Sequence, residues 1–285
     1  MRQKKLRFIR AYVALWGSTA IFCILLLLLL GTIFWRGVPH LTWSLLISED
    51  SILQGTVGIL PSIINTIFVI VVSLIIALPI GVGAAIYLSE YARSHIVVSL
   101  IEFAAEILAG IPSILYALAG VILFCTGLGL QKTLISASLT LAIMVLPTIL
   151  RTTQESLKTV PHSYREGALG LGAGKWRMIA TVVLPSSISG ILTGCILSIG
   201  RVVGETAVLL YTAGLSTSMQ NFTPSKILRV SGTTLSTALY VHAKERADVD
   251  TAFAIAVLLL LLTIAINLTA GLVGKKFSKQ DGKSA

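Results

Sequence analysis

The segment from Val160 to Pro185 combines charged side chains with a cluster of glycines, so it could hold a phosphate group or a protein partner. A phosphate-binding loop requires glycine, four residues and then Gly-Lys-Ser/Thr. Counting back from Gly174 and Lys175 places Leu169 at the first position, and Trp176 follows the lysine. The segment therefore does not match a nucleotide-binding loop, and any ATP hydrolysis must come from another subunit.

The same segment predicts two short helices joined by a glycine turn. Ser163 and Glu166 have the spacing of a capping box, which predicts a helix from about Tyr164 to Leu169 that stops at the glycines. A second helix is expected from Lys175 to Pro185. A rigid helix–turn–helix of this kind suits insertion into the groove of a partner protein.

Arg201 and Glu205 are charged residues inside an otherwise apolar stretch. Their separation of four residues predicts that they share one face of a helix. A charge at the centre of a membrane span costs about 2.5–3.5 kcal/mol, so two charges indicate a polar interior or a cavity. The two residues could form an ion pair that joins two helices. Alternatively, Arg201 could balance an oxyanion on a solute path, with Glu205 holding or releasing it, a role that we favour partly because a family resemblance described below includes both residues.

Three further charged residues lie near the ends of apolar runs. We interpret Glu102 and Glu106 as interfacial or gate contacts, because no nucleophile accompanies them. Arg151 either extends to the membrane interface or lies at the inner mouth of the solute path. The three cysteines and four histidines are too scattered for a metal site. We therefore expect no catalytic residue, no metal ion and no cofactor.

The elements that must position these residues are transmembrane helices. The 285 residues are 55% hydrophobic and only 12% charged, with a mean hydropathy of +0.91, whereas soluble domains carry about 25% charged residues. The apolar runs do not alternate with polar residues as barrel strands do, so we expect one all-α membrane domain over residues 1–285. Its six expected spans are Ala11–Trp35, Pro61–Leu88, Val98–Phe124, Thr133–Leu150, Ile188–Ala213 and Thr251–Val273.

The N-terminal basic residues and the apolar run that follows them could be a signal peptide. The run is longer than the apolar core of a signal peptide, which has about 7–15 residues, and no small-residue cleavage site follows it. We therefore expect an uncleaved first helix.

The distribution of Lys and Arg predicts the orientation of the chain. With the N-terminus inside, the inner segments hold 15 of these residues and the outer segments six, which favours cytoplasmic N- and C-termini. Because the basic residues lie at the edges of apolar runs, the net charge of +10 does not indicate nucleic acid as a partner. Two long connections remain: an inner one, residues 151–187, and an extracytoplasmic one, residues 214–250, which we expect to carry a short helix.

The inner connection resembles the cytoplasmic "EAA" coupling motif of ABC importer permeases. That pattern is Glu-Ala-Ala, three residues, Gly, nine residues and Ile-x-Leu-Pro. Here the matching positions are Glu166, Gly167, Ala168, Gly172, Val182, Leu184 and Pro185, with departures at Gly167 and Val182. The resemblance implies a MetI-like permease fold in which Glu166, Gly167, Ala168, Gly172, Leu184 and Pro185 couple the chain to a separate ATPase.

A closer resemblance, to the phosphate-uptake permease subunit of the PstA type, covers most of the chain. It rests on Tyr87–Arg93, Gly110–Ile114, Arg151–Glu155 and Arg201–Thr206. It implies a phosphate importer of the bacterial or archaeal cytoplasmic membrane, working by alternating access. The implied partners are membrane lipid, a sister permease that makes a heterodimer, two ATPase subunits and an extracytoplasmic phosphate-binding protein, for which Gly214–Asp250 is a candidate contact.

Three alternatives to phosphate import remain open from the sequence. The solute could be another oxyanion, such as sulfate or molybdate. A membrane-embedded enzyme acting on lipid phosphate groups would need a cluster of His, Asp or Lys near one interface, and the scattered histidines argue against it. A passive channel would not need the coupling segment.

Overall fold

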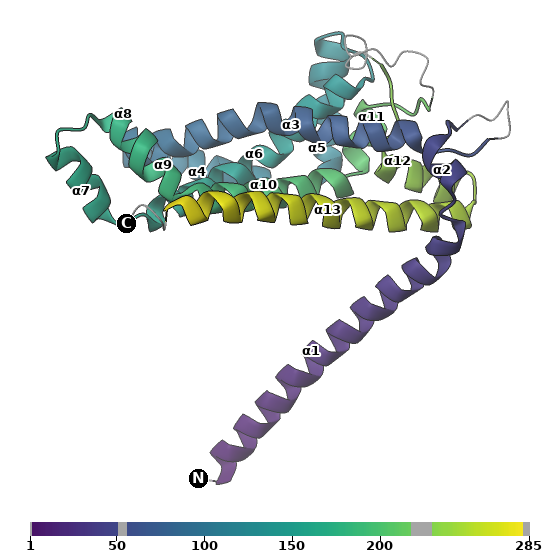
Figure 1. Cartoon of the computed structure of the whole chain (residues 1–285), viewed down its shortest axis with the longest axis horizontal. Coiled ribbons are helices and arrows are strands. Elements are labelled where there is room, and N and C mark those ends of the chain that lie inside the picture. The colour runs from purple at the N-terminus through teal and green to yellow at the C-terminus, as the bar shows by residue number, and fades with distance from the viewer. Residues whose placement is uncertain (1, 51–55, 218–229, 282–285) are drawn as a thin grey trace.

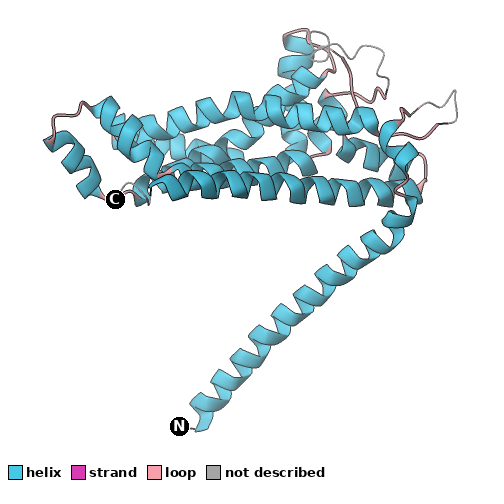
Figure 2. Cartoon of the chain, viewed as in Figure 1, coloured by secondary structure: helices cyan, strands magenta, loops and turns pink. Residues whose placement is uncertain are grey.

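Every regular element in the described part of the chain is a helix (Figures 1 and 2). The computed structural model describes residues 2–50, 56–217 and 230–281. The elements are α1 (Arg2–Gly37), η1 (Val38–His40), α2 (Trp43–Ile47), α3 (Leu60–Ile86), η2 (Tyr87–Tyr91), α4 (His95–Gly110), α5 (Ser113–Gly120), η3 (Val121–Gly127), α6 (Leu134–Thr159), α7 (His162–Gly170), α8 (Lys175–Met178), η4 (Ile179–Val183), α9 (Leu184–Ser186), α10 (Ile188–Gly204), α11 (Ala207–Thr212), α12 (Leu235–Tyr240), η6 (Val241–Glu245) and α13 (Val249–Asp281). The predicted all-α fold is confirmed.

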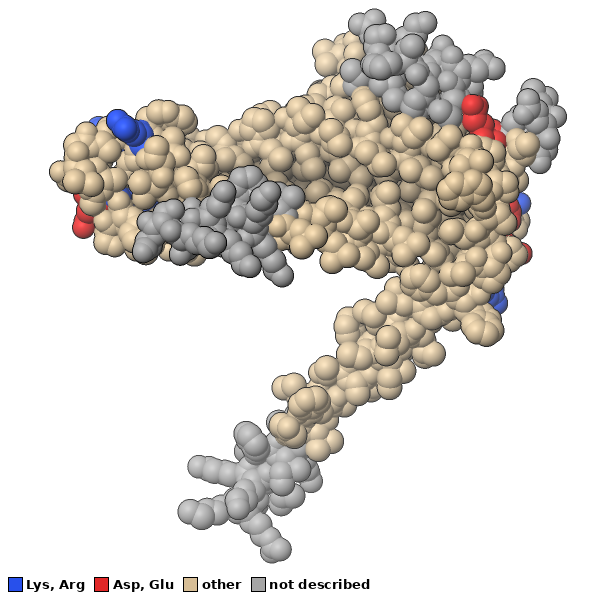
Figure 3. Space-filling model, viewed as in Figure 1, with Lys and Arg blue, Asp and Glu red and all other residues tan. Residues whose placement is uncertain are grey.

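The helices include enough apolar length for a multi-pass membrane protein. Four are long and apolar enough to cross a membrane alone: Tyr12–His40, Leu60–Tyr91, Leu134–Thr159 and Val249–Leu272. Two bent pairs also qualify, α4 with α5–η3 and α8–α9 with α10. If each pair crosses once, the described residues hold six spans. On the visible face, charged side chains gather at the two ends of the bundle and leave the surface between them uncharged (Figure 3).

The predicted third span, Val98–Phe124, is not one continuous helix. α4 ends at Gly110, and Ile111 has an extended backbone because the residue before a proline disfavours the helical region. The chain turns by 101° around Pro112 before α5 begins. Pro79 and Pro147, by contrast, lie inside α3 and α6 without ending them. Of the three prolines, Pro112 alone divides a predicted span.

α6 is the central helix of the bundle. Of its most apolar stretch, 67% is buried inside the chain. α10 lies directly against it, because a β-carbon at Gly190 would overlap Ser156 and one at Gly194 would overlap Thr152. Small residues permit this close approach of helix backbones in membranes. The pairing also sets the antiparallel register of α6 and α10.

α1 leaves the bundle at the end that carries α2 and extends away from it (Figure 1). It contacts α13 near its own C-terminal end, where the Arg36 guanidinium carbon lies 5.4 Å from the centroid of the Phe253 ring. None of the most apolar stretch of α1 is buried within the chain. Its surface is therefore free to contact lipid or another subunit.

The bundle has two different ends. α7, α8 and α9 lie at one end, where α13 also finishes, and α2 and α12 lie at the other (Figure 1). We call these the loop end and the far end. The short helix predicted within residues 214–250 is present as α12 and its continuation η6. Residues 218–229 of that segment lie outside the described residues.

Candidate functional site

The connection at the loop end begins later than the sequence predicts. α6 continues through Thr159, so Arg151 lies inside the helix and not at its end. No proline or glycine interrupts residues 151–159, and the helix stops only at Val160, which precedes Pro161 and has an extended backbone. The connection between α6 and α10 therefore covers residues 160–187 and not 151–187.

The first helix of the connection, α7, starts earlier than predicted. It covers His162–Gly170, where the sequence predicts Tyr164–Leu169. The expected capping box of Ser163 and Glu166 is not formed, because Pro161 occupies the N-cap position and no side chain caps the helix. Proline already holds the φ angle of a helix start, so the helix begins before Ser163.

The glycine turn after α7 is formed as predicted. Gly172 has a φ of +82°, a left-handed conformation that favours glycine. The backbone N–H of Ala173 donates to the carbonyl of Ala168 at 3.1 Å, and that of Gly172 donates to Leu169 at 2.9 Å. This pattern closes the C-terminus of a helix and reverses the chain direction. Gly172, a residue of the proposed coupling motif, thus permits the turn that ends α7.

The second helix of the connection packs firmly on the bundle. It runs through α8, η4 and α9, and it meets α10 at a bend of 63°. Met178, Ile179 and Val183 are buried in an apolar cluster with residues of α3, η2, α4 and the end of α6. The Lys175 ammonium nitrogen lies 4.8 Å from the centroid of the Tyr91 ring in η2. The connection is therefore a defined structure attached to the ends of several helices.

The outer surface of the connection carries large apolar side chains that are exposed within the described part of the chain. Tyr164 is 55% exposed, Leu171 92% and Trp176 65%. Glu166 and Gly167 are exposed beside them, whereas Ala168 and Leu184 pack partly against the buried cluster. Exposed apolar groups rimmed by charges are typical of protein interaction sites. The arrangement suits a partner that docks on α7.

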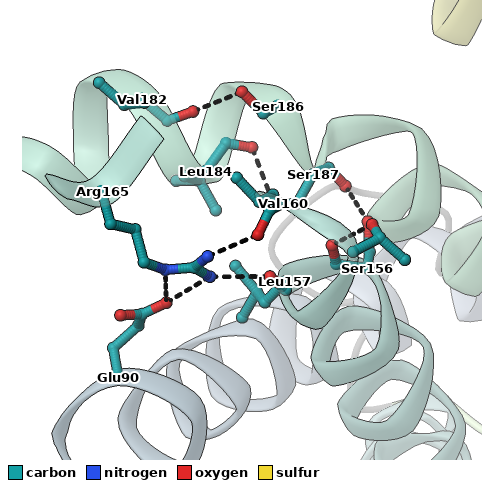
Figure 4. Close-up of polar contacts among 10 residues, drawn as sticks. Glu90, Ser156, Leu157, Val160, Arg165, Val182, Leu184, Ser186 and Ser187 are labelled. Carbon is teal, nitrogen blue, oxygen red and sulfur yellow. Dashed lines mark hydrogen bonds and ion pairs between the residues drawn. The ribbon is translucent and has the colours of Figure 1, made fainter. Parts of the chain in front are cut away.

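Arg165, next to Glu166, points inward (Figure 4). Its Nε and Nη2 donate to Glu90 Oε1 of η2 at 3.1 and 2.9 Å. Its Nη1 donates to the carbonyl of Val160 at 2.6 Å, and Nη2 also donates to that of Leu157 at 2.8 Å. The side chains of Arg165 and Glu90 are only 15% and 8% exposed. We call Glu90, Leu157, Val160 and Arg165 the junction.

The prediction that Arg201 and Glu205 share a helix face is wrong. α10 ends at Gly204, and Glu205 has an extended backbone at the break before α11. Glu205 Oε1 accepts a hydrogen bond from the backbone N–H of Val208 at 3.1 Å, so the carboxylate caps α11. Among the ion pairs of the described residues, none joins Arg201 to Glu205. The predicted fifth span is thus a discontinuous helix.

Arg201 is half-buried in the last turn of α10, where the carbonyl end of the helix favours a cation. It lies close enough to Tyr116 in α5 to interact with it electrostatically. Glu205 is 9% exposed, and its backbone oxygen accepts a hydrogen bond from Ser236 Oγ of α12 at 2.7 Å. The two residues therefore have separate roles: a cation at one helix end, and a cap at the start of the next.

Arg151 lies in a polar cavity between α4 and α6. Its Nη2 is 3.3 Å from Glu106 Oε2, and Lys158 Nζ is 3.6 Å from Glu102 Oε1. The cavity has a volume of about 370 Å³ and is lined by Ser99, Glu102, Phe103, Glu106, Arg151, Gln154, Glu155 and Lys158. The predicted gate contacts, Glu102 and Glu106, thus lie beside Arg151.

Arg201 does not line this cavity. Because Thr152 lies beside Gly194 on antiparallel helices, Arg201 is about two helical turns farther from the loop end than Arg151. The structure therefore separates the predicted path residues into two levels. Sequence reasoning missed the Glu90–Arg165 pair, because 75 residues separate its members and no short-range pattern joins them.

Comparison with known proteins identifies the class. The family described as "Binding-protein-dependent transport system inner membrane component" matches residues 77–279. The chain therefore belongs to this family, whose members are permease subunits of ABC importers and multi-pass proteins of the cytoplasmic membrane.

Two curated relatives are similar over most of the chain. It is 35% identical over 204 residues to the probable ABC transporter permease protein YqgI of Bacillus subtilis, covering 72% of this chain and 69% of that protein. It is 32% identical over 218 residues to the phosphate transport system permease protein PstA 1 of Mycobacterium tuberculosis (strain CDC 1551 / Oshkosh), covering 76% and 70%.

Two solved structures share the fold. One is a bacterial alginate ABC transporter in complex with an alginate pentasaccharide-bound periplasmic protein, with a TM-score of 0.61, 17% identity, and coverage of 93% of this chain and 98% of that one. The other is the inward-facing MetNI methionine ABC transporter, with a TM-score of 0.59, 17% identity, and coverage of 77% and 94%. The predicted MetI-like permease fold is confirmed.

Proposed function

We propose that this permease subunit forms half of the path by which an ATP-driven importer carries inorganic phosphate into the cell. The observation that carries the proposal is similarity to PstA phosphate permeases over about three quarters of the chain. Two ATPase subunits supply the energy, since the Gly-rich segment of this chain does not match a nucleotide-binding loop. A sister permease completes the path, and a binding protein delivers phosphate from outside.

The connection at the loop end is the proposed contact with the ATPase. Glu166, Gly167, Ala168, Gly172, Leu184 and Pro185 have the spacing of the coupling motif. Tyr164, Leu171 and Trp176 present apolar surface around Glu166, which a groove of the ATPase would cover. Closure of the ATPase pair would then displace α7 and α8 and rock the attached helices between two access states.

This assignment fixes the proposed orientation. The loop end and both termini face the cytoplasm, as the excess of Lys and Arg in the inner segments favours. The far end, including α12 and the rest of residues 214–250, faces outward and is the proposed contact for the phosphate-binding protein. Lipid and the sister permease would cover the exposed α1.

Arg201 and Arg151 are the proposed contacts of phosphate along the path. Arg201 lies beside a break between α10 and α11, and interrupted helices form solute sites in many transporters. Glu205 contributes by capping α11 at this break and does not hold Arg201. Arg151 lies nearer the cytoplasm, where its guanidinium forms an ion pair with Glu106 in this structure.

The proposal is tested with the assembled transporter in proteoliposomes. Uptake of radiolabelled phosphate should require ATP on the side of the membrane where the ATPase subunits lie. Unlabelled phosphate should inhibit this uptake more strongly than sulfate or molybdate. A chain lacking Gly170–Gly174 should hydrolyse ATP without accumulating phosphate. Stronger competition by another oxyanion would show that this anion, and not phosphate, is the solute. Uptake without ATP would identify a passive channel.

A further inference from the structure

α7 carries the proposed ATPase contact but has no apolar anchor of its own. None of its residues is buried, and only Ala168 packs partly against the nearby cluster. The adjoining η4, in contrast, buries Ile179 and Val183 completely. A displacement of α7 can reach the membrane helices through the chain on either side of it, and more directly through any side chain that bonds α7 to them. Arg165 is the one residue of α7 whose side chain makes hydrogen bonds to other described elements.

Arg165 joins α7 to two membrane helices at once (Figure 4). Leu157 lies in the last turn of α6, where its carbonyl accepts a long backbone hydrogen bond from Val160 N–H at 3.4 Å, and the carbonyl of Val160 lies beyond the end of the helix. The guanidinium donates to both. Its other bonds reach Glu90, which continues α3 in the π-helical turn η2. Charge-assisted bonds with several fixed directions resist displacement more than a single contact does.

The geometry of these bonds requires arginine and a carboxylate. A planar guanidinium can donate to Glu90 and to two carbonyls simultaneously, whereas a lysine ammonium is a point charge on a flexible stem. Burial strengthens the pair, because water does not compete for groups that are 15% and 8% exposed. Arg93, three residues from Glu90, is exposed and makes no hydrogen bond or ion pair among the described residues, so it offers a matched control.

We propose that Arg165 and Glu90 are positioning residues for energy coupling, which transmit movement of α7 to α3 and α6. The inference rests on the proposed function only in that the ATPase docks on α7. Neither residue touches phosphate or nucleotide in this account. Weakening the pair should therefore leave ATP hydrolysis in place and reduce the phosphate taken up for each ATP hydrolysed.

The test uses the complete transporter carrying Arg165→Lys, Glu90→Gln or the control Arg93→Lys. Co-purification of the ATPase subunits measures assembly, and proteoliposomes report radiolabelled phosphate uptake and ATP hydrolysis together. We expect normal assembly, a fall of about fivefold or more in uptake per ATP for Arg165→Lys, a fall in the same direction for Glu90→Gln, and no change for Arg93→Lys.

Two results would overturn the inference. One is uptake per ATP within about twofold of the unmodified transporter in both junction variants. The other is failure of both variants to assemble, which would show that the pair is needed for folding and not specifically for coupling. Glu166→Ala separates this inference from the proposed function. If Glu166→Ala has no effect on ATPase binding or uptake, the docking assignment fails; if it reduces them and Arg165→Lys does not, only the inference fails.

Discussion

Two arginine–glutamate pairs lie near the same end of α6, and they differ in exposure and in their other partners. Arg165 and Glu90 are 15% and 8% exposed, and two backbone carbonyls accept further hydrogen bonds from the guanidinium. Arg151 and Glu106 are 43% and 70% exposed in an open cavity, at a distance of 3.3 Å. A buried pair held by several hydrogen bonds is a fixed connection, whereas an exposed pair in high dielectric contributes little stability and can be displaced. We therefore propose that the first pair transmits movement and that the second contacts a passing anion.

The largest expected difference concerns stability. Arg165→Ala leaves the Glu90 carboxylate buried without a cation and removes the side-chain donor from the carbonyls of Leu157 and Val160, which should cost about 3–5 kcal/mol. The double variant Glu90→Leu with Arg165→Met should regain most of this loss, because an apolar pair of similar volume needs no partner. Thermal unfolding of the purified chain in detergent measures both. Equal stability of Arg165→Ala and the unmodified chain would show that the junction is not a fixed connection.

The exposed pair should behave in the opposite way. Arg151→Ala should change unfolding free energy by less than about 1 kcal/mol, because solvent screens the pair. Phosphate uptake should nevertheless fall, by about tenfold or more if the guanidinium bonds the anion directly. Arg201→Ala is a companion variant at the second level of the path. Uptake and detergent melting are measured on the same preparations, and a large loss of stability with normal uptake would reverse the assignment.

The local parts of this site could be predicted from the sequence. Gly172 marked the turn after α7 because a positive φ favours glycine, and the apolar runs marked the spans. The exact positions at which the helices begin and end could not be predicted from the sequence. The Glu205 carboxylate caps α11 in place of pairing with Arg201, and Pro161 displaced the capping box expected at Ser163. The junction joins residues 75 positions apart, and such a contact depends on how whole helices pack.

A third carboxylate, that of Asp248 at the far end of the bundle, should have a smaller effect on stability. Burial alone would raise the pKa of Asp248, but hydrogen bonds with Thr251 and His242 lower it below its ordinary value of 3.8. A lowered pKa in the folded state contributes stability above pH 3.8 that disappears as the pH falls through the folded pKa. Asp248→Asn should therefore be less stable at neutral pH, by under about 1 kcal/mol because Asn also caps helices.

The check on Asp248 is a series of melting curves from pH 7 downward. The difference between Asp248→Asn and the unmodified chain should begin to shrink below pH 3.8 and vanish once the pH is below the lowered pKa of the folded state. A difference that persists at lower pH would mean that the carboxylate charge is not its source. The neighbouring pair, Arg246 Nη2 and Asp50 Oδ2 at 2.7 Å, is present in both proteins, so it cancels in the comparison. The hydrogen bond from Arg246 to Asp50 raises the pKa of the guanidinium, which stays charged throughout this range.

We propose that a separate ATPase drives phosphate through this subunit by acting on residues 160–187. The most direct test measures phosphate uptake and ATP hydrolysis in the same proteoliposomes, with the unmodified chain and with the chain lacking Gly170–Gly174. The account predicts that uptake follows ATP hydrolysis in the first case, and that hydrolysis continues without uptake in the second. Unchanged uptake per ATP after the deletion would contradict it.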